Sequence, residues 1–206
     1  MIRSVILATF SAGLLAVPAF GQPKSDPDWP CVQRKVTTLG AGAVWTGPDI
    51  AAAGPWGDDR QAAQLARKLA SRRTELSEMD GLLDEFLSQG EAAEKEKRLT
   101  RVFAGVFEVI NGERDTVVNG ITRYAQGQRR LAERIRDEAD KVSTVRDAPD
   151  ADTTKASKDV SDLETAFNWD RRIFQERNQS VSYVCEVPTL LEQRLGEIAK
   201  KIQARL

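Results

Sequence analysis

The sequence predicts an all-α protein: an elongated antiparallel three-helix bundle with a short fourth C-terminal helical segment and an irregular, Trp-rich N-terminal arm. Apolar residues recur at alternating steps of three and four through most of residues 58–206, which is the period of an amphipathic helix. No proline lies between Pro55 and Pro149, so long helices can run uninterrupted there. We therefore divide the chain into a leader at 1–21, an arm at 22–57 and a helical bundle domain at 58–206.

Residues 1–21 have the pattern of a secretory signal peptide. Arg3 supplies a positive charge near the start, an apolar run extends from Val5 to Val17, and small residues predict cleavage after Gly21. The apolar run is shorter than the ~20 residues that a membrane-spanning helix needs. We therefore expect a periplasmic or secreted protein that has no transmembrane span after cleavage.

The chain contains two cysteines and no histidine. Export carries a protein into an oxidising compartment, where two cysteines more often form a disulfide than remain thiols, so we expect Cys31 to bond Cys185. The lack of histidine excludes a Ser-His triad, an imidazole base and His-bearing zinc sites. The sequence also lacks a P-loop and a nucleophile elbow. These observations predict no catalytic residue, no metal and no cofactor.

Charge restricts the class of partner. The 30 basic and 31 acidic residues give a net charge of −1, whereas a nucleic-acid-binding protein would carry a basic face. We therefore expect no nucleic-acid partner, and instead another exported protein or an envelope component. The sequence does not specify an oligomeric state.

The arm is too rich in helix breakers to form a long helix, since it has five prolines and five glycines between residues 23 and 57. It nevertheless carries three of the four tryptophans, Trp29, Trp45 and Trp56, which is not typical of a disordered tail. We interpret these indoles as aromatic anchors that dock the arm onto the helices, helped by the disulfide. The alternative is an exposed aromatic platform for a sugar or a peptide.

The first predicted helix follows the arm. Asp58 is a candidate N-cap after Gly57, and the Ser-Gln-Gly tract at 88–90 is a candidate stop. One seam of mostly apolar residues connects them. The seam positions are Ala62, Leu65, Leu69, Arg72, Leu76, Met79, Leu83 and Phe86. This pattern predicts a single continuous helix.

The second predicted helix has its seam from Leu99 to Val142. Because no proline interrupts this part of the chain, the helix can extend for about 50 residues, or about 75 Å. A turn at 147–154 then reverses the direction of the chain.

The third predicted helix has its seam from Val160 to Val184, and Pro188 separates it from the short fourth segment, in which the pattern resumes up to residue 206. Taken as one kinked rod, these two segments nearly match the second helix in length. Because short turns make consecutive helices antiparallel, the segments together predict the elongated bundle.

Four glycines lie inside the second predicted helix, where each costs about 1 kcal/mol relative to alanine. Their spacing of 7, 8 and 7 residues places them near one face: Gly105, Gly112, Gly120 and Gly127. Such a stripe lets another backbone or a large ring approach closely. We interpret it as a close-packing stripe against the arm or the last helix, and a groove for a ligand or partner is the alternative.

Polar residues on the seams are candidates for a buried polar network: Arg72, Glu113, Asp170 and Arg177. Asp170 shares its predicted face with two phenylalanines, so we expect it to be buried and paired, either with Arg177 or with an arginine of the second helix. The tract at 168–172 (Asn-Trp-Asp-Arg-Arg) also combines an acid, two cations and an indole. An active-site carboxylate is the alternative interpretation of Asp170.

The predicted function is that of an exported, non-enzymatic helical interaction or scaffold protein of the cell envelope. One alternative is a carboxylate-dependent hydrolase of envelope polymers that uses Glu113 or Asp170. Another is a carrier of an apolar ligand held between the helices. An enzyme requires converging acids in a cleft and a carrier requires a cavity, so the structure discriminates between these functions.

Overall fold

The computed structural model describes residues 26–147 and 153–206, and these residues form helices, turns and loops. Four α-helices follow one another along the chain: α1 (Arg60–Ala70), α2 (Met79–Ser88), α3 (Lys95–Arg146) and α4 (Thr153–Gln203). Short 3-10 turns are η1 (Ala41–Ala43), η2 (Trp56–Asp58) and η3 (Ala92–Glu94). The predicted all-α class is confirmed. The predicted leader at 1–21 and most of the predicted turn at 147–154 lie outside the described residues.

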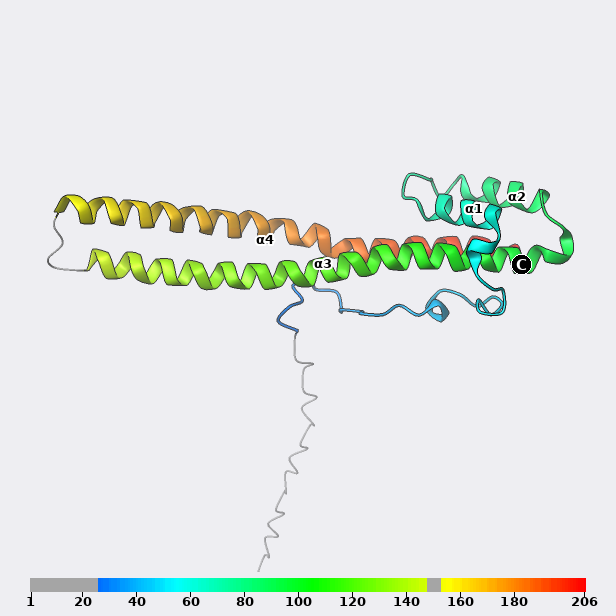
Figure 1. The fold of residues 1–206 in the computed structure, drawn as a ribbon, viewed down its shortest axis with the longest axis horizontal. Helices are drawn as coiled ribbons and strands as arrows, with labels where there is room; N and C mark the ends of the chain where they lie inside the picture. Colours follow the sequence, from blue (N-terminus) through cyan, green and yellow to red (C-terminus); the bar gives the residue numbers. More distant parts are fainter. Residues whose placement is uncertain (1–25, 148–152) are drawn as a thin grey trace, which may run out of the picture.

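The long hairpin of α3 and α4 sets the shape of the molecule (Figure 1). α3 has 52 residues and α4 has 51, so each is about 75 Å long at 1.5 Å per residue. The four glycines of α3 do not interrupt the helix. The predicted length and antiparallel direction of these two helices are confirmed.

The first predicted helix is broken into α1 and α2. Ser71 has an extended backbone, and residues 71–78 form a loop between the two helices. The Arg194 guanidinium of α4 donates to the carbonyls of Leu69 (2.9 Å), Ser71 (2.6 Å) and Thr74 (2.8 Å). These bonds satisfy carbonyls that a helix end would leave without a donor. The donor lies more than 100 residues away in sequence, so the local pattern could not predict the break.

The third predicted helix and the predicted fourth segment form one helix, α4, that passes through Pro188. Proline removes the backbone donor that would bond the Val184 carbonyl, which permits a kink without ending the helix. Figure 1 shows that α4 bends in this region. Packing on both sides keeps the segments helical, because Pro188 is buried and Cys185, one turn earlier, is 5% exposed.

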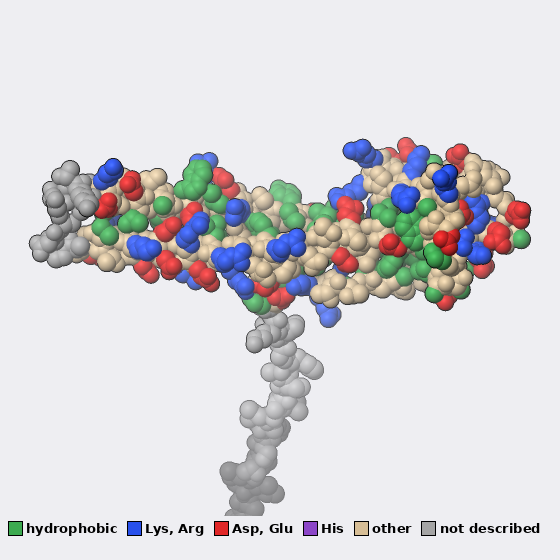
Figure 2. Space-filling model, viewed as in Figure 1, with side chains coloured by type: hydrophobic (Ala, Val, Ile, Leu, Met, Phe, Trp, Pro, Cys, Tyr) green, Lys and Arg blue, Asp and Glu red, His purple; other side chains and the backbone are tan. Residues whose placement is uncertain are grey.

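The molecule has two regions that differ in construction. In the head, α1, α2 and the arm cover residues 95–112 of α3 and 189–203 of α4 (Figure 1). The hydrophobic core lies there and draws on all of these elements. In the distal hairpin, formed by residues 113–146 and 153–188, the start of the arm contacts α3 as far as Gln126 and Arg129, which both bond Asp28. Beyond that point the described parts of α3 and α4 have only each other to pack on. Figure 2 shows acidic and basic side chains distributed along that region.

Candidate interaction surfaces

The arm is docked on the head by two of the three predicted aromatic anchors. Trp45 is 7% exposed and stacks on Phe103 of α3, with ring centroids 4.0 Å apart and an interplanar angle of 7°. Its indole nitrogen donates to the Pro48 carbonyl at 2.8 Å. Trp56 packs over α3, and its indole nitrogen donates to Glu108 at 2.8 Å. The aromatic rings therefore hold an irregular segment against a helix.

Each of these two indoles has one face covered by another side chain. Phe103 covers one face of Trp45. Arg67 of α1 lies over the Trp56 ring, with its guanidinium carbon 5.3 Å from the centroid. An open hollow of 500 Å³ lies between Trp56 and α3, and its wall includes Ile50, Phe107 and Asn111. The Asn111 amide oxygen is buried there without a hydrogen-bond partner among the described residues.

The third predicted anchor, Trp29, lies beside the disulfide. Its indole nitrogen donates to the Gln33 carbonyl at 2.6 Å, so the ring closes a local turn of the arm. Cys31 and Cys185 form a disulfide with their Cα atoms 5.5 Å apart. The predicted pairing is confirmed. The bond joins the arm to α4 at the boundary between the head and the distal hairpin.

The seam residue that the structure buries in the middle of α3 is Arg114, not its neighbour Glu113. Arg114 is 1% exposed and donates to Glu192 of α4, to Asp115 and to the Val36 carbonyl of the arm. In the second predicted helix, Ile110 and Val117 are apolar seam positions, and the seam position between them is filled by a charged residue. That charged position was the available signal of a buried charge. Acceptors from α4, from α3 itself and from the arm compensate the buried charge of Arg114. A local sequence pattern does not encode contacts between such distant parts of the chain.

The four glycines of α3 have different surroundings. A Cβ atom at Gly105 would lie 2.7 Å from the Cβ of Ala66 and 2.8 Å from the Trp56 ring, so this glycine permits close packing of α1 and the arm. A Cβ atom at Gly112 or Gly120 would meet no other atom within 4 Å, and one at Gly127 would be 4.0 Å from Arg130. The structure therefore requires a glycine at only one of the four positions.

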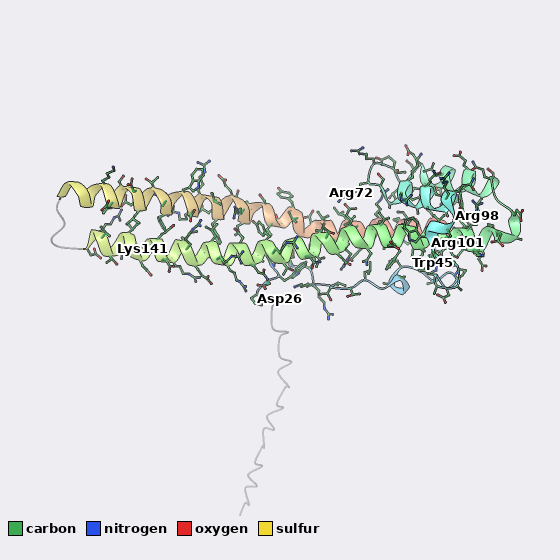
Figure 3. The ribbon with its side chains drawn as sticks, in the orientation of Figure 1. Asp26, Trp45, Arg72, Arg98, Arg101 and Lys141 are labelled. Carbon is green, nitrogen blue, oxygen red and sulfur yellow. A yellow bond between two sulfur atoms is a disulfide. The ribbon has the colours of Figure 1, made fainter. Side chains whose placement is uncertain are left out.

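The seam polar residues form separate pairs. Arg72 and Glu113 form an ion pair at the surface, with side chains 56% and 37% exposed. Figure 3 shows Arg72 on the α1–α2 loop. Asp170 is 7% exposed and pairs with Arg134 of α3 rather than with Arg177. Residues seven apart on one helix are about 10.5 Å apart along its axis, so Arg177 cannot reach Asp170, whereas Arg134 lies across the hairpin.

No pair of acids suited to hydrolysis arises from the predicted candidates. Asp170 lies beside Arg134 of α3. Because Arg134 is 21 residues from Glu113 on α3, the two acids are about 32 Å apart along the helix. Carboxylates that act together on a glycosidic bond are about 5 to 10 Å apart. Within residues 26–147 and 153–206, no group of three or more acidic or cysteine side chains could hold a metal ion.

A shallow apolar hollow lies between the helices of the distal hairpin. It has a volume of 170 Å³ and is lined by Gly120, Ile121, Tyr124, Ser180, Val181 and Val184. The Tyr124 hydroxyl donates to the Arg177 carbonyl, and burial raises the pKa of Tyr124 above its usual value, so it remains a donor. Ligand pockets usually enclose about 300 to 1,000 Å³. The hollow is smaller than a carrier of drug-sized or lipid ligands requires.

The side of α4 that faces away from α3 carries large exposed side chains. We call this surface the α4 outer face, and its apolar members are Trp169 (60% exposed), Tyr183 (74%) and Leu190 (58%). They are 14 and 7 residues apart, so they lie near one line on the helix. Further along the same line, Lys201 pairs with Asp80 of α2. The head therefore covers the C-terminal part of this face and leaves the rest uncovered.

The sequence pattern marked Trp169 only as part of the tract at 168–172, and Tyr183 lies off the seam of the third predicted helix. An aromatic residue off the seam of a long helix was the available signal. Among the described residues, no helix combines the length and the apolar character needed to cross a membrane.

Comparison with known proteins gives no assignment: no family model matches the chain, and neither a curated protein nor a solved structure matches it.

Proposed function

We propose that this protein is an exported, non-enzymatic interaction or scaffold protein of the cell envelope, and that the α4 outer face binds its partner. The observation that carries this proposal is the alignment of Trp169, Tyr183 and Leu190, each more than half exposed, on one side of a long helix. Large aromatic side chains supply much of the binding energy at protein interfaces when a partner buries them.

The spacing of these residues supports a helical partner. A seven-residue repeat keeps side chains on the seam between two helices that supercoil around each other. α2 already occupies the head end of the α4 outer face, where Asp80 and Asp84 pair with Lys201 and Arg205. A helix from a partner would extend the same packing toward the distal end.

The frame of the molecule supports a role in presenting this surface. α3 and α4 are each about 75 Å long, and the disulfide fastens the arm across their middle. A surface that is rigid before binding loses less conformational entropy when it binds. The leader pattern and the disulfide both support export, because disulfides persist in oxidising compartments.

The alternative functions have less support. The two candidate acids do not converge, because Glu113 on α3 pairs with Arg72 and Asp170 on α4 pairs with Arg134, far along the rod. The hollow between the helices has a volume of 170 Å³, below the range of typical ligand pockets. A binding surface on the outside of the rod requires neither a cleft nor a cavity.

Site-specific photocrosslinking in the native envelope tests the proposal. A photoreactive phenylalanine analogue in place of Tyr183 or Leu190 should give the same discrete protein adduct. The matched control is the analogue in place of Arg123, which is exposed on α3. Absence of adducts from both α4 positions, or equal labelling from Arg123, would contradict it. N-terminal sequencing of the exported protein should begin at Gln22, and an uncleaved chain would contradict the export step.

A further inference from the structure

We propose that a second copy of this chain docks antiparallel along the distal part of the α4 outer face, with a two-fold axis near Phe167. The inference rests on the proposed function only in treating that face as a contact surface. It assigns the second copy to the part of that face that contains Trp169, and leaves Tyr183 and Leu190 at and beyond the edge of the contact, where another protein can bind.

The residues of the distal α4 outer face are complementary to their own reversed order. In chain order they are Lys158, Asp162, Thr165, Trp169, Arg172 and Glu176, at steps of four and three that keep them on one side of the helix. About an axis at Phe167, the antiparallel copy places Lys158 opposite Glu176. It also places Asp162 opposite Arg172. Every charge on this face then meets an opposite charge, and the two-fold axis repeats each pair.

These charged groups are available to a partner. Lys158 and Asp162 are exposed and form no ion pair among the described residues. Arg172 and Glu176 pair with each other at 2.8 Å, and their side chains are 72% and 60% exposed. In the dimer each keeps this partner and gains a second one from the other copy. The result is an alternating row of charges on each side of the axis.

Trp169 provides the apolar centre of the contact. It lies two residues from the proposed axis, so the two indoles are about 6 Å apart along the helix direction. Each indole faces Thr165 of the other copy. Association therefore covers the only tryptophan of the described residues that is more than half exposed, and aromatic residues at the centre of an interface are the usual energetic anchors.

The extent of the uncovered face fits a second hairpin. With the axis at Phe167, residues 153–181 of the two copies overlap, which gives about 42 Å of helix-to-helix contact. The α1–α2 loop covers α4 from Arg194 onward, through its bonds to that side chain. The overlap ends at residue 181, before that loop, so the two α4 helices pack on each other between the two α3 helices.

Mass measurement on the purified exported protein tests the dimer. Sedimentation equilibrium should show a concentration-dependent species of twice the monomer mass, weakened by added salt because exposed charges are screened. Arg172→Glu and Asp162→Lys should each weaken dimerisation at least about tenfold, since each places like charges opposite one another twice. The matched control, Arg123→Glu, should leave the dimer unchanged. Circular dichroism should show unchanged helix content in all three variants.

Mixing supplies the decisive measurement. An equimolar mixture of the Arg172→Glu and Asp162→Lys variants should dimerise again, because the two introduced charges then face each other across the contact. The native Asp162 of the first variant and the native Arg172 of the second also pair. The double variant should dimerise by itself, since it exchanges the two charges of each pair.

Three results would overturn the inference. The first is a protein that is monomeric at all measurable concentrations. The second is a pair of single variants that dimerise normally, and the third is a mixture of them that does not dimerise. Since these assays use pure protein, their failure leaves the photocrosslinking result with another protein unaffected.

Discussion

The head and the distal hairpin contain the same two helices but are stabilised differently. In the head, core side chains such as Leu195 and Ile198 have no exposed surface, because α1, α2 and the arm close over the hairpin. In the distal region two helices alone cannot enclose their apolar stripes, and ion pairs such as Arg146–Glu164 connect them across the surface. Exposed pairs of this kind contribute about 0 to 1 kcal/mol each. The head therefore supplies most of the stability, and the distal hairpin offers most of the uncovered surface.

Removing the disulfide should lower the free energy of unfolding more than any other change proposed here, because the bond joins the arm to α4 where the head meets the distal hairpin. The bond closes a sequence separation of 154 residues, for which the chain-entropy model gives a stabilisation of about 5 kcal/mol as an upper figure. The Cys31→Ser, Cys185→Ser double variant should lose several kcal/mol in urea unfolding. Unchanged unfolding free energy would mean that the arm is held by its aromatic anchors alone.

A matched pair of leucine truncations compares the two regions directly. Leu195→Ala in the head should cost about 3 to 4 kcal/mol, because this residue has 0% exposure and neighbours on every side. Leu131→Ala in the distal hairpin, at 6% exposure, should cost about 2 kcal/mol, since the two-helix region can collapse around the lost side chain. Thermal unfolding of both variants measures the difference. A larger loss for Leu131→Ala would reverse the assignment of the core to the head.

Two glycine substitutions should change stability in opposite directions. Gly105→Ala should destabilise the head by about 1 to 3 kcal/mol, because the new methyl group overlaps Ala66 and Trp56. Gly120→Ala should stabilise the protein by up to about 1 kcal/mol, since no neighbouring atom lies within 4 Å and alanine favours the helix. Denaturant midpoints of the two variants give the signs. A stabilising Gly105→Ala would show that the close packing at that position can relax.

The smallest expected effect concerns Asp59, which caps α1 by accepting from the Ala62 amide at 3.0 Å and pairs with Arg98 at 2.9 Å. Burial would raise the pKa of Asp59, but the Ala62 amide and Arg98 outweigh it and hold the pKa below its usual value. Because the folded-state pKa is the lower one, the ionised group stabilises the fold above the unfolded-state pKa, and this contribution disappears as the pH falls through the folded-state value.

Asp59→Asn keeps a capping oxygen and removes the charge. It should lower the unfolding free energy by about 1 kcal/mol at neutral pH and leave it unchanged at a pH below the folded-state pKa of Asp59. Urea titrations at both pH values check this. An equal loss at both pH values would assign the effect to the cap rather than to the charge.

The sequence predicted the long helices because their information is local. A proline-free run with a sustained apolar seam is sufficient to specify α3, and Phe167 and Phe174 mark the side of α4 that faces α3. The disulfide was equally accessible, since two cysteines behind a leader leave one pairing. The predicted docking of the arm by Trp45 followed from the large apolar surface of indole.

Features that depend on contacts between distant parts of the chain were decided only by the tertiary structure. Arg194 donates to one carbonyl at the end of α1 and to two in the α1–α2 loop, at the point where the single predicted helix breaks. The burial of Arg114 in place of Glu113 depends on acceptors from α4 and the arm. The exposure of Trp169 depends on where α1 and α2 end. A helical period specifies which residues share a face, but only the packing of the other elements determines which faces are covered.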